Sequence, residues 1–143
     1  MNIEKQVVCK DLSIELEKAG YKQEGFWVWV NLWQKGRFVE RKNRWILTQK
    51  VGAYGRKYTV APTVAEGFSV MPEEIVYAGF IYTFKVAKVG KMYRAYYDCM
   101  FMAVDKDLER AEDPPNRLGV QEDKNCSNAI HTVWLYLKKE GLL

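Results

Sequence analysis

Residues 75–104 have the sequence IVYAGFIYTFKVAKVGKMYRAYYDCMFMAV, and this stretch decides the fold class. Aromatic and β-branched residues are abundant on both sides of residues 87–90, which is typical of two strands joined by a turn. We therefore predict a β-hairpin over residues 75–86 and 91–104. Both faces of the second strand are largely apolar near its end, so we expect this strand to lie centrally in a sheet.

Apolar residues recur at helical spacing near both ends of the chain. In residues 3–19 they are Val8, Leu12, Leu16 and Ala19, with Asn2 suited to start the helix and Gly20 to end it. In residues 123–140 they are Cys126, Ala129, Ile130, Val133, Trp134 and Leu137, with Gly141 suited to end the helix. We predict an amphipathic helix in each segment.

The middle of the chain predicts two further strands and a short helix. Residues 26–33 and 44–51 alternate with the period of two that is typical of strands. Thr63 and Glu66 have the spacing of a capping box, which marks a helix start. This helix should end before Pro72, because proline disfavours helical geometry in the residue before it.

Residues 105–121 are charged and contain Pro114 and Pro115, so we expect a solvated loop there. The predicted order is α-β-β-α-β-β-α. We predict a single α+β domain over residues 1–143, with one antiparallel sheet of about four to five strands packed by the amino- and carboxy-terminal helices.

Composition excludes several classes of protein. The chain has 143 residues, 48% of them hydrophobic, with a net charge of +4, which suits one globular domain. Because it has neither an apolar run of about 18–20 residues nor a signal-peptide pattern, we expect a cytoplasmic protein without a membrane partner. Cys9, Cys99 and Cys126 are far apart and only one histidine is present, so we expect no metal site and no cofactor.

Several features of the second half are shared with other proteins: Ala61-Pro62-Thr63 opening a short helix, a closing Pro72, a Tyr-rich hairpin, Asn128-Ala129 and the ending Leu135–Leu142. In these features the chain resembles small uncharacterised proteins encoded by bacterial phages and mobile elements. Gly67 interrupts a helix that is longer in that pattern. The resemblance implies a bacterial accessory protein and assigns no activity to particular residues.

The sequence does not favour catalysis. His131 is one position past the apolar stripe of the last helix, and Cys126 is turned about 140° away from it. Asp98 and Cys99 are adjacent in a strand and point to opposite faces. Glycines in residues 51–58 precede a strand-like segment, unlike those of a phosphate-binding loop. We expect a non-enzymatic protein in which His131 is a structural residue at the core boundary.

The strongest candidate for a binding surface is the basic segment 25–60, which contains eight basic residues and one acidic residue, a net charge of +7. Alternation predicts that Phe26, Val28, Val30 and Leu32 face the core. The predicted site residues are Trp27, Trp29, Trp33, Arg37, Arg41 and Arg44.

Three interpretations of this surface follow. A helix that covers the tryptophan face would make the indoles part of the core. Exposed indoles and arginines would instead suit a protein partner or self-association, which is the function we expect first. Single-stranded nucleic acid is the alternative partner, because indoles stack on bases and cations neutralise phosphates.

Overall fold

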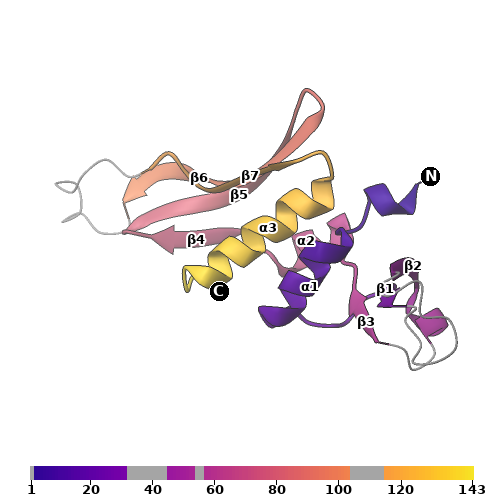
Figure 1. Cartoon of the computed structure of the whole chain (residues 1–143). Coiled ribbons are helices and arrows are strands. Elements are labelled where there is room, and N and C mark those ends of the chain that lie inside the picture. Colours follow the sequence, from indigo (N-terminus) through magenta and orange to yellow (C-terminus); the bar gives the residue numbers. More distant parts are fainter. Residues whose placement is uncertain (1, 32–44, 54–56, 104–114) are drawn as a thin grey trace, which may run out of the picture.

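The structure is a computed structural model that describes residues 2–31, 45–53, 57–103 and 115–143. These residues form three α-helices and two antiparallel sheets (Figure 1). One sheet has three strands in the order β2-β1-β3, and the other has four in the order β4-β5-β6-β7. The predicted α+β class is confirmed, whereas the prediction of one sheet is wrong.

The helices and strands follow each other along the chain with two additional 3-10 segments. The first half contains the 3-10 helix η1 (Ile3–Lys5), α1 (Lys10–Lys18), β1 (Trp27–Asn31), β2 (Trp45–Gln49), the 3-10 helix η3 (Lys50–Ala53) and β3 (Tyr58–Val60). The second half contains α2 (Val64–Val70), β4 (Glu74–Tyr77), β5 (Phe80–Val89), β6 (Met92–Ala103), β7 (Arg117–Asp123) and α3 (Cys126–Lys139). The described residues form seven strands, whereas the predicted order contained four.

The amino-terminal helix is interrupted where the chain meets the segment before α2. Asn2 caps the short helix η1 rather than a long one, and α1 starts only at Lys10. Between them, Val7 forms a β-bridge with Thr63, and the Val8 N–H donates to the Pro62 carbonyl oxygen at 2.9 Å. The predicted continuous helix over residues 3–19 is wrong because these extended contacts replace helical ones.

The predicted strand over residues 75–86 is divided by a two-residue turn. Ala78 and Gly79 have φ angles of +49° and +82°, and Tyr77 pairs with Phe80 across the turn between β4 and β5. β6 pairs on both sides, which confirms its central position. Part of the predicted loop 105–121 is the edge strand β7, and residues 104–114 lie outside the described residues.

The main core lies between the four-stranded sheet and α3, which crosses one face of that sheet (Figure 1). The sheet contributes the buried side chains of Tyr82, Ala95, Tyr97, Cys99 and Leu118. From α3 come Ala129, Ile130, Val133, Trp134 and Leu137, all of them in the predicted stripe. α1 and α2 also pack on α3.

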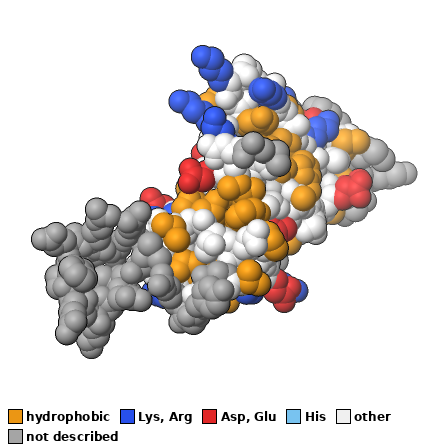
Figure 2. Space-filling model, turned by 90° about the vertical axis from the view of Figure 1, so that its right-hand side faces the viewer, with side chains coloured by type: hydrophobic (Ala, Val, Ile, Leu, Met, Phe, Trp, Pro, Cys, Tyr) orange, Lys and Arg blue, Asp and Glu red, His pale blue; other side chains and the backbone are white. Residues whose placement is uncertain are grey.

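The opposite end of the molecule carries the three-stranded sheet. Figure 2 views the molecule from this side, and hydrophobic side chains gather in the middle of the face. Large hydrophobic side chains of this part of the chain are exposed, among them Phe26 and Val51. Phe26 was predicted to face the core, and that prediction is wrong.

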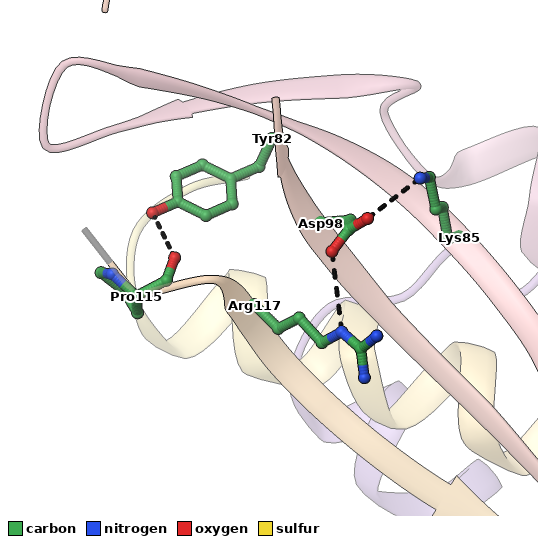
Figure 3. Close-up of polar contacts among 5 residues, drawn as sticks. All are labelled: Tyr82, Lys85, Asp98, Pro115 and Arg117. Carbon is green, nitrogen blue, oxygen red and sulfur yellow. Dashed lines mark hydrogen bonds and ion pairs between the residues drawn. The ribbon is translucent and has the colours of Figure 1, made fainter. Parts of the chain in front are cut away.

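The face of the four-stranded sheet that points away from α3 carries ion pairs (Figure 3). Asp98 on β6 lies 3.0 Å from the Lys85 ammonium on β5 and 3.6 Å from the Arg117 guanidinium on β7. The Arg117 guanidinium also stacks over the Tyr96 ring. On the other side of the sheet, the Tyr82 hydroxyl donates to the Pro115 carbonyl oxygen at 2.9 Å. The contacts of Arg117 and Pro115 hold the edge strand β7 and the residues before it against β6 and β5.

The start of α2 matches the sequence prediction, and Gly67 allows the helix to pack closely on α3. Thr63 and Glu66 form the predicted capping box. A Cβ atom at Gly67 would lie 2.7 Å from Cε1 of His131 and 2.8 Å from Cγ2 of Ile130, both buried in α3. Glycine is therefore required for α2 to approach α3 this closely.

We expect Gly67→Ala to destabilise the protein by about 1–3 kcal/mol, because overpacking of a buried contact outweighs the better helix propensity of alanine. Thermal or urea unfolding would measure this change. The matched control is Ala65→Gly, an exposed site in the same helix, which should cost about 1 kcal/mol through propensity alone. A gain in stability on Gly67→Ala would contradict the close packing of α2 on α3.

We expect Ala78→Asn to stabilise the protein by about 1 kcal/mol, because alanine is unfavourable at positive φ and Asn-Gly is a preferred two-residue hairpin turn. The measurement is again the free energy of unfolding. Ala87→Asn, in β5 where Ala87 pairs with Arg94, should give no gain. Equal effects of the two substitutions would argue against a left-handed conformation at residue 78.

Candidate functional site

The register of the three-stranded sheet determines which side chains share a face. Trp29 pairs with Leu47 on one side and with Thr59 on the other, and Asn31 pairs with Trp45. Directly paired residues of antiparallel strands lie on the same face. Trp27, Trp29 and Trp45 therefore belong to one face, and Val28, Val30 and Val60 to the other.

α1 covers part of the tryptophan face. The Trp29 indole is half-buried, and its N–H donates to the Val8 carbonyl oxygen at 2.9 Å. Beside it, Thr59 is buried, and its hydroxyl donates to the Ser13 carbonyl oxygen in α1 at 3.1 Å. Trp27 is also half-buried, and its ring meets the ring of Phe26 edge to face. These two indoles are partly packed against protein.

The other face carries a small second core. Val28 and Val30 are buried there with Val60 and Ala53, as predicted for Val28 and Val30. The remaining predicted residues, Leu32, Trp33, Arg37, Arg41 and Arg44, lie outside the described residues. The binding role of the predicted tryptophans and arginines stays a prediction.

A pocket of about 360 Å³ opens between α1 and the tryptophan face. It is lined by Ile14, Glu17, Lys18, Trp45 and Lys57. This volume is within the range of about 300–1,000 Å³ that is typical of small-ligand sites. Trp45 was not among the predicted site residues, although it lies in the predicted strand 44–51 of the basic segment.

Local structure places these five side chains around one opening. Ile14, Glu17 and Lys18 are three and four residues apart in α1, so they lie on one side of the helix. Trp45 begins β2 opposite Asn31, the last residue of β1. The Asn31 N–H donates to the Lys57 carbonyl oxygen at 3.0 Å, which brings Lys57 to the same end of the sheet.

The described residues that line the pocket carry a net positive charge, with two lysines and one glutamate. Within the described part of the chain, neither Lys18 nor Lys57 forms an ion pair. Lys50 of the same basic segment is engaged elsewhere, since its ammonium donates to the Gln23 carbonyl oxygen at 3.0 Å. Lys18 lies in the last turn of α1, where its charge offsets the partial negative charge of the helix terminus. The site thus combines an indole, two ammonium groups and the Glu17 carboxylate.

The sequence predicted His131 at the boundary of the core. In the structure it is fully buried within the main core. Its Nδ1 is 2.7 Å from the Ser127 carbonyl oxygen, which can only accept, so Nδ1 carries the proton. Its Nε2 accepts from the Tyr21 hydroxyl at 3.2 Å. Burial disfavours the imidazolium ion and lowers the pKa of His131 to about 4. Both nitrogens are occupied, which supports a structural role for this residue.

The buried neutral imidazole predicts loss of stability in acid. His131 has a lowered pKa in the folded protein, so the unfolded chain takes up the proton first as the pH falls below about 6.5. The free energy of unfolding should therefore decrease between about pH 6.5 and pH 4, by about 3 kcal/mol in total from this group.

Urea unfolding at several pH values would measure how the free energy of unfolding changes with pH. His131→Gln, which does not titrate, should be less stable at neutral pH but should show a flatter dependence between about pH 6.5 and pH 5. Parallel slopes of the two proteins would exclude His131 as the source of the acid sensitivity.

No protein-family model, curated protein or solved structure matches this chain. Within the described ranges, no helix is long and apolar enough to cross a membrane. The same residues contain no group of three or more His, Cys, Asp and Glu side chains arranged to hold a metal ion. A functional assignment therefore depends on the pocket and its chemistry.

Proposed function

We propose that this protein is a non-enzymatic binding protein and that its ligand is single-stranded nucleic acid. One observation carries the proposal: Trp45, Lys18 and Lys57 line the same pocket. An aromatic ring beside cations is the combination that proteins use to bind single strands without strict sequence preference.

Each part of the pocket has a separate physical role. A base that stacks on an indole contributes about 1–3 kcal/mol. Lysine ammonium groups neutralise phosphates and release counterions, which makes binding strongly dependent on salt. The net charge of +7 in residues 25–60 adds a long-range attraction for polyanions.

The lining of the pocket also favours nucleic acid over the protein partner that the sequence suggested first. Lysine and glutamate are depleted in the cores of protein interfaces, yet they make up three of the five described residues that line the pocket. Self-association or a protein partner would instead use exposed hydrophobic side chains such as Phe26 and Val51. The two functions therefore predict different surfaces and different responses to salt.

Oligonucleotide binding tests the proposal. Fluorescence anisotropy of a labelled DNA or RNA strand of about 12 nucleotides should show binding at about 50 mM salt and a marked loss at about 200 mM. Trp45→Ala should weaken binding about tenfold, as expected for one lost stacking contact. The double variant Lys18→Ala/Lys57→Ala should weaken it further and reduce its salt dependence.

The control removes the same charge at a distant place. Lys88→Ala/Lys91→Ala removes two charges at the end of the β5–β6 hairpin in the other sheet and should leave most of the affinity intact. Circular dichroism would verify that each variant is folded. Absence of binding by the wild type at the lower salt would make the proposal wrong, and so would equal losses in both double variants. Sedimentation would then test for a second copy of the chain.

A further inference from the structure

Glu17 is the one acidic side chain among the described residues that line the pocket. It follows Ile14 by three residues and precedes Lys18, so it lies on the pocket side of α1. No ion pair with Lys18 or Lys57 is present among the described residues. Glu17 is exposed, so its carboxylate is free to contact a ligand that enters the pocket, although its charge reduces the attraction for phosphate.

We propose that Glu17 selects bases that carry an exocyclic amino group. The inference depends on the proposed function, because it requires a base to stack on Trp45. A stacked base presents its edge to the surrounding side chains, and Glu17 belongs to the same lining. A carboxylate can only accept hydrogen bonds, so it matches the amino group of cytosine, adenine or guanine.

Thymine and uracil fit this carboxylate poorly. Their single N–H on the pairing edge lies between two carbonyl oxygens, and both oxygens repel a negative charge. The lysines cannot supply this discrimination, because their ammonium groups bind phosphates that every nucleotide carries. Glu17 is therefore a specificity residue, whereas Trp45, Lys18 and Lys57 provide affinity.

The test compares two pyrimidine strands of equal length, oligo(dC) and oligo(dT), at pH 7.5 and low salt. Cytosine and thymine have single rings of similar size, so differences in stacking area are small. Wild-type protein should bind oligo(dC) about tenfold more tightly, the discrimination expected for one hydrogen-bonded base edge. Glu17→Gln should reduce this ratio to about twofold or less, because an amide can also donate to the thymine carbonyl oxygen.

Glu15→Gln is the matched control. Glu15 is exposed on the same helix, is not among the described lining residues, and lies about 200° around the helix axis from Glu17. This variant makes the same charge change and should retain the tenfold preference. Loss of the preference in both variants would show a general charge effect and would overturn the role of Glu17.

The outcomes separate the two proposals. Equal affinity of the wild type for both strands, with binding still weakened by Trp45→Ala, would overturn base selection and leave the proposed function in place. Absence of binding to either strand would overturn both. A preference that disappears only in Glu17→Gln would support both and assign the selectivity to one side chain.

Discussion

The two-sided burial of α3 is the constraint on which the rest of the structure depends. One side of this helix covers the four-stranded sheet, and the other side receives α1 and α2. Polar groups on a helix buried in this way must find partners inside the protein. His131 is bound by Tyr21, and the Ser127 hydroxyl donates to the Pro62 carbonyl oxygen at 2.8 Å. These hydrogen bonds determine where the first half of the chain lies.

The start of α3 also positions the amino-terminal segment and, through it, the pocket. The Asn125 side-chain amide donates to the Val7 carbonyl oxygen at 2.7 Å, and the Asn128 side chain accepts from the Cys9 N–H at 2.9 Å. Val7 is consequently held in its β-bridge with Thr63 and Cys9 is extended, and α1 begins only at Lys10. The carboxyl-terminal half of α1 forms one wall of the pocket. Structural contacts around α3 thus place the side chains that we propose to bind a ligand.

Local signals in the sequence were sufficient for some elements and insufficient for others. The helical stripe of α3 and the capping box of α2 are short-range patterns, and both were predicted correctly. The turn at Ala78 was missed because alanine seldom adopts positive φ. β7 was missed because four of its seven residues are polar or charged and only Leu118 is buried, so it lacks the apolar alternation of a core strand. The separation into two sheets depends on long-range pairing, which periodicity cannot reveal.

The candidate site shows the same limit of prediction from local sequence patterns. The basic segment was apparent from charge, but which indole borders a pocket depends on where α1 lies.

Only Val28, Val30, Ala53 and Val60 form the described core of the three-stranded sheet, whereas fifteen buried residues form the main core. Small cores give low local stability. A ligand that contacts Trp45, Lys57 and α1 together would link this sheet to the main core, and its binding free energy would stabilise the weaker part of the fold.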